Sequence, residues 1–311
     1  MGLAEKLLTW VEELTNPSLF ESLRNFSPNN AEINYGSDSN GTRTLFDEAA
    51  RMSWRRDTRH LKIEDIGKMS VSQASREFAR QLIHRDDASI VVPISLVSAV
   101  SASKSDLHMH PSLYAFGKYC YDIYREKHKG LSEQEYFEYC INEGLKEGHN
   151  NFDIKLWSPA LRWRNSGGSH RFSTAHYISV EKNYNYNITG KLTIYSLNYI
   201  WLEELNQEYN TFIMNVNNTA DILVLYNAFK INSYDSSSTF ISLGAVPWIS
   251  SESTTILLIL NKKQQLPRIV RQWLQSHLHA GRIMPFSKVI DDLKTNEMNV
   301  RQSIKFIIGK S

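Results

Sequence analysis

The sequence has very few cysteines and almost no excess of charge. Cys120 and Cys140 are the only two cysteines, too few for a disulfide framework or a four-cysteine zinc site. Both lie in aromatic-rich segments of helical pattern, so we interpret them as small core residues. Lys and Arg number 35 against 33 Asp and Glu, a formal net charge of +2. This small charge excludes a global attraction to nucleic acid or anionic lipid and leaves only local patches.

The chain also lacks long hydrophobic runs. No run approaches the roughly 18 apolar residues of a membrane-spanning helix, and the first residues alternate charged and apolar side chains, unlike a secretory signal. We therefore predict a cytoplasmic protein without a membrane segment. The three spaced glycines of dinucleotide-binding proteins and the phosphate loop that ends in Gly-Lys-Ser/Thr are missing as well. No repeat of about 20–50 residues occurs, which excludes a solenoid.

The segments that are present follow an α/β order. Helical periodicity and β-branched runs predict helices at 3–15, 44–55, 70–84, 111–126, 132–147 and 171–181, a polar loop at 34–42, and extended segments at 89–100, 155–165 and 190–198. Ser132 and Glu135 have the spacing of a capping box. The rest of the chain predicts strands at 211–217, 221–231, 238–249 and 254–262, then helices at 266–279 and 285–295. Alternation of strands and helices indicates an α/β fold with α+β elaborations.

A glycine-rich turn stands between a predicted strand and a predicted helix. Gly167 and Gly168 permit positive φ and a close approach of a ligand to the backbone, and a helix start presents unpaired N–H groups. Ser169 adds a hydroxyl, His170 a switchable donor and Arg171 a guanidinium fork suited to phosphate. The pattern indicates an anion site. The alternative is a structural turn whose His and Arg only cap the helix or form ion pairs.

This turn, followed by Ala175 and a hydrophobic helix, resembles the Gly-x-His-Arg box of the ParB and sulfiredoxin superfamily, whose members bind nucleotide phosphates there. Segments 91–99 and 190–196 are similar to the opening and closing strands of that fold. In sulfiredoxins a catalytic cysteine stands where this chain has Ser169, and a hydroxyl is a far poorer nucleophile than a thiolate. Peroxiredoxin repair is therefore not expected. The chain as a whole resembles an uncharacterised bacterial or phage-encoded family.

The resemblance implies a domain organisation. We expect an N-terminal helical extension over 1–87, a ParB/sulfiredoxin-like nucleotide-binding core over 88–200, and a strand-rich α+β elaboration over 201–311.

The first functional hypothesis is an enzyme that binds a nucleotide, ATP or another nucleoside triphosphate with magnesium, and transfers or hydrolyses a phosphoryl group. The backbone of Gly167, Gly168 and Ser169 would hold phosphate. His170 and Arg171 would bind it too and neutralise the charge that develops during transfer. We therefore predict Ser169, His170 and Arg171 as the catalytic residues.

The second hypothesis is a non-enzymatic module that binds DNA or a partner protein. The segment 51–85 is locally basic, with Arg55, Arg56, Arg80 and Arg85. Such a surface binds polyanions, although a solvated helix face accounts for the same charges.

The third hypothesis is an NAD enzyme similar to ADP-ribosyltransferases. It rests on the serine-rich segment 236–244 with Arg162 or Arg164 upstream. The two-acid motif of those enzymes does not follow Ser238, and a strand preceded by a serine loop accounts for the same residues.

Two pairs of alternate histidines remain. His108 and His110, with Asp106 nearby, and His277 with His279 have ligand chemistry. Neither pair has a third ligand at a diagnostic spacing. We therefore predict no metal site and expect a helix terminus at each pair.

Overall fold

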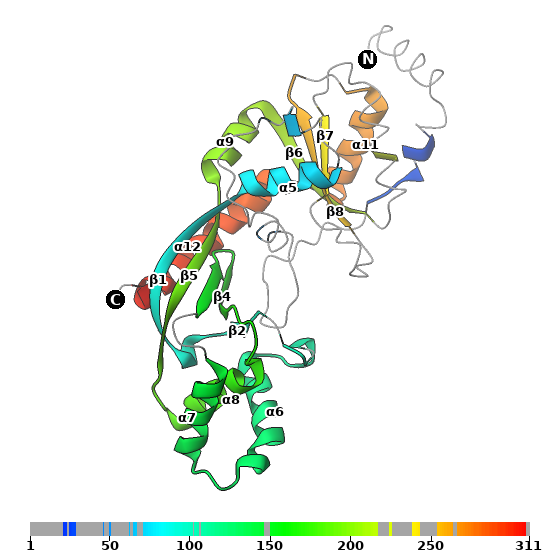
Figure 1. Cartoon of the computed structure of the whole chain (residues 1–311). Coiled ribbons are helices and arrows are strands. Elements are labelled where there is room, and N and C mark those ends of the chain that lie inside the picture. The colour runs from blue at the N-terminus through cyan, green and yellow to red at the C-terminus, as the bar shows by residue number, and fades with distance from the viewer. Residues whose placement is uncertain are drawn as a thin grey trace, which may run out of the picture. The chain divides into compact units, whose positions relative to one another are not determined.

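The chain folds into two units. The computed structural model describes residues 21–23, 25–28, 46, 50, 62, 65–66, 71–101, 103–105, 107–145, 150–216, 224–225, 238–242, 254–263 and 266–308 (Figure 1). Unit 1 contains the described residues of Met1–Ile33, Glu48–Ile83 and Leu197–Asp292, and unit 2 contains those of Asn34–Asp47, His84–Ser196 and Leu293–Ser311. The helix predicted over 3–15 and the loop predicted over 34–42 lie outside the described residues.

Unit 2 is built on a five-stranded mixed sheet. Its strand order is β1 (Ile83–Pro93), β5 (Asn187–Leu197), β3 (Asn151–Lys155), β4 (Ser158–Trp163) and β2 (Ala99–Val100). β3 runs parallel to β5 and antiparallel to β4, and the short β2 runs parallel to β4. The carboxyl ends of β2 and β4 therefore lie side by side.

Three helices of unit 2 pack together, and the first two begin at a side-chain cap. α6 (Leu113–Tyr124) begins after Ser112, whose hydroxyl accepts a hydrogen bond from the Ala115 amide at 3.1 Å. α7 (Glu133–Gly144) carries the predicted capping box of Ser132 and Glu135, with hydrogen bonds of 3.3 Å and 2.7 Å. The third helix, α8 (Ser169–Lys182), packs against both others (Figure 1).

The core of unit 2 joins these helices to the sheet. Side chains of the cluster include Val92, Phe116, Phe137, Phe152 and Phe172. The rings of Trp163 and Phe172 stack with centroids 4.2 Å apart, which fixes the end of β4 to the start of α8.

The two cysteines lie in the same core. Cys120 and Cys140 are both buried, which confirms their interpretation as core residues. Burial raises the pKa of each thiol to about 12, so neither is a thiolate at neutral pH.

Unit 1 contains an antiparallel sheet. Its strand order is β7 (Ser238–Ser242), β8 (Thr254–Asn261), β6 (Tyr209–Val216) and β9 (Ile283–Pro285). The apolar run from Ile256 to Leu260 is buried along its whole length, as expected for an inner strand covered on both faces. The helices are α5 (Val71–Leu82), α9 (Tyr199–Glu208), α11 (Arg268–His279) and α12 (Phe286–Ile308), the last of which runs on into unit 2.

The mixed α/β character expected from the sequence is confirmed, but the strand predicted over 89–100 is wrong. The chain forms β1 over Ile83–Pro93, a 3-10 turn at Ile94–Leu96, and then β2. β1 is an edge strand, so charged residues are tolerated in its exposed half. Arg85 pairs there with Asp87 at 3.2 Å.

Other elements also differ from the sequence-based prediction. The extended segment predicted over 155–165 contains β4 and, before it, a turn at Leu156 and Trp157, whereas β3 at Asn151–Lys155 was not predicted. α9 was not expected, and Val224 and Leu225, within a predicted strand, are helical. Within the described ranges, no helix combines the length and hydropathy that a membrane crossing requires.

The contact between α6 and α8 leads to a stability prediction. A Cβ atom at Gly117 would lie 2.1 Å from the backbone oxygen of Ser173. Because backbone atoms on a packed helix cannot move away cheaply, we expect Gly117→Ala to lower the free energy of unfolding by about 1–3 kcal/mol. Urea titration followed by tryptophan fluorescence measures the change.

Gly130→Ala is the matched control, since no atom lies within 4 Å of the added Cβ. It should change the free energy of unfolding by less than about 0.5 kcal/mol. Equal stability of the two variants would contradict the close helix contact.

Candidate functional site

The candidate site lies where β2 and β4 end. Their last residues, Val100 and Trp163, are register partners in a parallel pair. The loops that follow are joined through Ser101, whose hydroxyl accepts a hydrogen bond from the Asn165 amide and donates one to its Oδ1, both at 3.2 Å. In open α/β sheets, ligands bind outside the carboxyl ends of neighbouring strands.

Gly168 forms the bend that starts α8. Its φ of 71° lies in the left-handed region, where glycine is favoured. Its carbonyl oxygen accepts the first helical hydrogen bond, from the Phe172 amide at 2.9 Å. The bend predicted from the sequence is present at Gly168, whereas the helix begins at Ser169 rather than near 171.

The first three amides of α8 have no acceptor in the described part of the chain. They belong to Ser169, His170 and Arg171, and Gly168 has no side chain with which to cap them. The N-terminus of a helix carries the positive end of its dipole. These amides are therefore available to an anion.

Ser169 points into the protein and contacts the loop after β2. Only 8% of the residue is exposed, and its hydroxyl donates to Ser103 Oγ at 3.2 Å. The same Ser103 oxygen accepts the Ser105 amide at 3.2 Å. Loop residues 103–105 are thereby fixed against the first turn of α8.

His170 is half-buried and contacts the same loop. Its Nε2 lies 2.8 Å from Ser105 Oγ, and its ring packs against Phe116 and Tyr124 with centroids 5.6 Å and 5.8 Å away. Burial, assisted by the nearby charge of Lys104, lowers the pKa of His170. The imidazole is therefore neutral at pH 7 and can accept a proton.

The Arg171 side chain lies on a different side of α8 from Ser169 and His170. Its Cβ lies 3.2 Å from where a Cβ of Gly144 in α7 would be, and its charge acts on the thiol of Cys140. The side chain is exposed. The structure therefore brings Ser169 and His170 together with the loop after β2, but directs the guanidinium toward α7.

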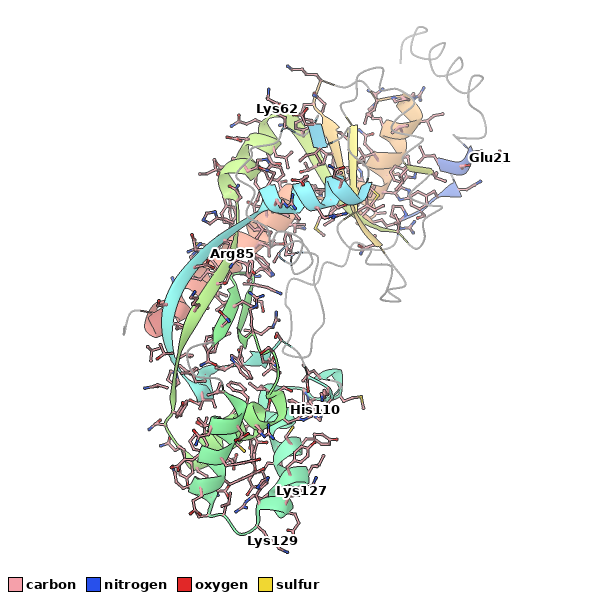
Figure 2. The ribbon with its side chains drawn as sticks, viewed as in Figure 1. Glu21, Lys62, Arg85, His110, Lys127 and Lys129 are labelled. Carbon is pink, nitrogen blue, oxygen red and sulfur yellow. The ribbon has the colours of Figure 1, made fainter. Side chains whose placement is uncertain are left out.

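Lys127 adds positive charge on the α6 side. Its Nζ lies 5.5 Å from the centroid of the Tyr124 ring, and Tyr124 also packs against His170. Figure 2 shows Lys127 and Lys129 toward the tip of the hairpin formed by α6 and α7. Positive groups thus come from Lys104, Lys127 and Arg171, on three segments.

Sequence reasoning missed the loop residues Ser103, Lys104 and Ser105. They lie more than 60 positions before the glycine turn, and only β2 and β4 bring the two segments together. The signal was the polar run Ser101-Ala102-Ser103-Lys104-Ser105 directly after an apolar strand.

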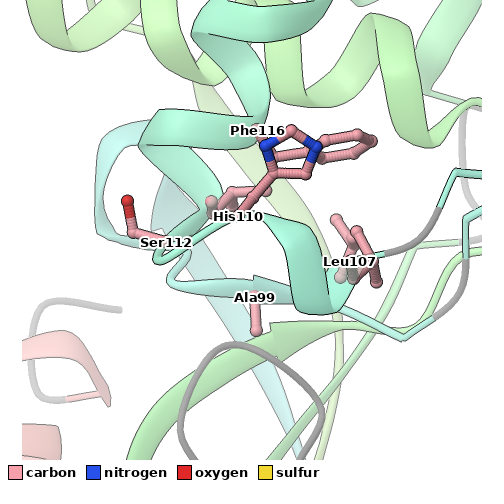
Figure 3. Close-up of a pocket in the computed structure, with 7 residues that line it drawn as sticks. Ala99, Leu107, His110, Ser112 and Phe116 are labelled. Carbon is pink, nitrogen blue, oxygen red and sulfur yellow. The ribbon is translucent and has the colours of Figure 1, made fainter.

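A small pocket lies beside the site. It is lined by Ala99, Val100, Leu107, His110, Ser112, Leu113 and Phe116 (Figure 3). Its volume of about 10 Å³ holds about one water molecule. Phe116 lines this pocket and also packs against His170, and a nucleotide base is too large to enter the pocket.

The described members of the two histidine pairs make aromatic or backbone contacts. The side chain of His108 and the whole of Asp106 lie outside the described residues. His110 packs against Phe116 and Tyr119. Among the described residues, no three His, Cys, Asp or Glu side chains gather closely enough to hold a metal ion.

His277 and His279 belong to the last turn of α11, where residues two apart point to different sides. His277 packs against Trp273, whereas His279 Nδ1 lies 2.8 Å from the backbone oxygen of Gln275.

The arginines behind the DNA- or protein-binding hypothesis are partly paired with carboxylates. Arg80 contacts Glu77, and Arg85 pairs with Asp87, while Arg55 and Arg56 lie outside the described residues. The DNA- or protein-binding hypothesis stays a prediction.

Arg162 and Arg164 both lie near the buried Asp153, at 3.7 Å and 3.8 Å. They belong to the five-stranded sheet or its edge, whereas Ser238 belongs to β7 of the other sheet. The NAD enzyme hypothesis also stays a prediction.

Residues 88–292 match a protein family described as a family of unknown function, DUF6685. This span is more than half of the 311 residues. The chain belongs to the DUF6685 family. Searches of curated proteins and of solved structures found no significant match. The matched span contains the loop after β2, the glycine turn and the whole of α8, so the site belongs to the DUF6685 region.

The bend at Gly168 gives a prediction for the DUF6685 chain. A Cβ atom there would lie 2.5 Å from the Gly144 backbone oxygen and would occupy a left-handed position. We expect Gly168→Ala to lower the free energy of unfolding by about 1–3 kcal/mol. The adjacent Gly167→Ala is the control, because its Cβ meets no atom within 4 Å. Urea unfolding curves compare the two variants. An unchanged free energy of unfolding in Gly168→Ala would contradict the left-handed bend at Gly168.

A second prediction concerns His176, which is buried in α8 and 5% exposed. Burial lowers its pKa to about 4, although backbone hydrogen bonds to Val97 and Ser95 oppose the shift. The unfolded chain binds the proton near pH 6.5, so it holds more protons than the folded chain between pH 6.5 and 4. Stability should therefore fall by about 3 kcal/mol as the pH drops through this window.

Urea unfolding at a series of pH values tests this expectation. In His176→Gln, which has no titrating ring, the fall should be smaller by about that amount. Identical pH dependence in the two proteins would assign the effect to other groups.

Proposed function

We propose that the DUF6685 chain binds the phosphates of a nucleotide, ATP or another nucleoside triphosphate, at the first turn of α8. The reaction that follows is transfer or hydrolysis of the terminal phosphoryl group. We also infer that the five-stranded sheet with α8 is a ParB/sulfiredoxin-like core, and that the protein is cytoplasmic.

The observation that carries the proposal is the set of three backbone amides without an acceptor in the described chain. They belong to Ser169, His170 and Arg171 and lie at the positive end of a 14-residue helix. Phosphate oxygens satisfy such amides and interact favourably with the helix dipole. The resemblance of the glycine turn to the ParB and sulfiredoxin box supports the same ligand.

The surrounding side chains support a phosphorylated ligand over a simple carboxylate. The charge of Lys104 acts on His170, Lys127 lies beside Tyr124, whose ring packs against His170, and Arg171 lies at the α7 side. Several cations on different segments match the spread charge of a polyphosphate better than one carboxylate charge. In this arrangement Arg171 and His170 contact different phosphate groups of the ligand rather than the same phosphate oxygen.

Magnesium would arrive with the triphosphate as part of the substrate complex. Mg²⁺ keeps several waters and binds through phosphates with one or two carboxylates. The chain's own residues then act on the phosphates through amides, lysines and His170.

Thermal unfolding in the presence of nucleotides tests the proposal. A ligand that binds only the folded state at 100 times its Kd stabilises it by about 2.7 kcal/mol, which raises Tm by several degrees. We expect this shift with at least one of ATP, CTP or GTP plus magnesium, and a much smaller shift with NAD. Lys104→Ala and Arg171→Ala should each reduce the shift by half or more.

Lys182→Ala is the matched control, because it removes one positive charge from the opposite end of the same helix. Its nucleotide shift should equal that of the wild type. The proposal fails if no nucleotide raises Tm, or if Lys104→Ala, Arg171→Ala and Lys182→Ala respond alike. Stabilisation by duplex DNA alone would favour the DNA-binding hypothesis instead.

A further inference from the structure

Three hydroxyls lie at the first turn of α8, and only one of them pairs with the imidazole. The hydroxyls of Ser169 and Ser103 are hydrogen-bonded to each other at 3.2 Å. Ser105 Oγ instead lies 2.8 Å from His170 Nε2. A serine hydroxyl within hydrogen-bond reach of an imidazole is the arrangement that activates serine nucleophiles.

Both members of this pair are held in place yet accessible. The Ser105 amide bonds to Ser103 Oγ, which fixes the backbone of the nucleophile. The His170 ring packs against both Phe116 and Tyr124. Ser105 and His170 are both only half-buried, so a substrate can reach the hydroxyl. By contrast, Ser169 is 8% exposed, which makes it the poorer nucleophile although the glycine motif contains it.

We propose that Ser105 is a covalent nucleophile toward phosphoryl groups and that His170 is its general base. The identity of the phosphoryl donor rests on the proposed function, whereas the pairing of Ser105 with His170 does not. The amides of Ser169, His170 and Arg171 belong to the same turn and stabilise the negative charge of the reacting oxygens.

The reaction has two balanced steps. Ser105 Oγ attacks the terminal phosphorus, the new Oγ–P bond forms, and the bond from phosphorus to the leaving diphosphate oxygen breaks with its electron pair on that oxygen. His170 Nε2 takes the hydroxyl proton and passes it to the departing diphosphate. A water molecule then attacks phosphorus, a new O–P bond forms, and the Oγ–P bond breaks with its electron pair on Ser105 Oγ. His170 takes the water proton, and inorganic phosphate leaves. The proton returns to Ser105.

The test uses a fluorophosphonate probe on the full chain, which needs no knowledge of the natural substrate. Attack by an activated serine forms an Oγ–P bond and releases fluoride, while the imidazole takes the proton. Peptide mass spectrometry locates and times the adduct. We expect labelling at Ser105 to be at least tenfold faster than at Ser166, an exposed serine two residues before Gly168.

Two variants address the roles of the pair. Ser105→Ala should lose the adduct, and His170→Phe, which preserves the packing against Phe116 and Tyr124 but cannot accept a proton, should slow labelling about 100-fold. Ser166→Ala should label at Ser105 like the wild type. Circular dichroism and Tm verify that each variant is folded.

The outcomes separate this inference from the proposed function. Equal labelling of Ser105 and Ser166 in the wild type overturns the inference without recourse to any variant. A labelling rate that His170→Phe leaves unchanged overturns the role of the base. A protein that labels at Ser105 but gains no stability from nucleotides retains the nucleophile and loses the nucleotide proposal. A protein that nucleotides stabilise but that does not label preferentially at Ser105 retains nucleotide binding and loses the nucleophile.

Discussion

The close approach of α8 to its neighbouring helices is the constraint on which the rest of unit 2 depends. A Cβ atom is excluded at Gly117, where α6 meets the backbone of Ser173, and at Gly168, where the start of α8 meets the backbone of Gly144. These contacts set the position of the first turn of α8. Stacking of Trp163 on Phe172 connects the same turn to the end of β4. The amides, hydroxyls and imidazole of the candidate site therefore stand on a rigid frame.

The site gains its chemistry from two segments that are distant in sequence. α8 contributes the amides, Ser169 and His170, and the loop after β2 contributes Ser103, Lys104 and Ser105. Both segments follow parallel strands that end at one edge of the sheet. The partly apolar surroundings also matter, because burial keeps the His170 imidazole neutral and able to act as a base. In the proposed site, the amides of α8 bind an anion, while Phe116 and Tyr124 of α6 orient the His170 imidazole.

Local patterns predicted the features that depend on neighbours in sequence. The capping box of α7 and the bend at Gly168 were correctly predicted, since both are set within a few residues. α6, α7 and α11 were found because their apolar spacing is regular, whereas α12 runs on to Ile308, well past the predicted end at 295. The first half of β1 was missed, since at its exposed edge position Arg85, Asp86 and Asp87 interrupt the apolar pattern. Likewise, α9 and β3 were missed, and the turn between β3 and β4 consists only of Leu156 and Trp157, with no glycine to mark it.

Taken alone, the amino-acid order determined the α/β composition, the glycine bend and the presence of a serine, a histidine and an arginine beside it. Those properties follow from backbone freedom and hydrophobic spacing, which act over a few residues. Only the tertiary structure decided that Ser105 rather than Ser169 meets the imidazole and that Arg171 turns toward α7. The reason is geometric: successive residues of a helix point about 100° apart, so each contacts whichever element the fold packs on that side.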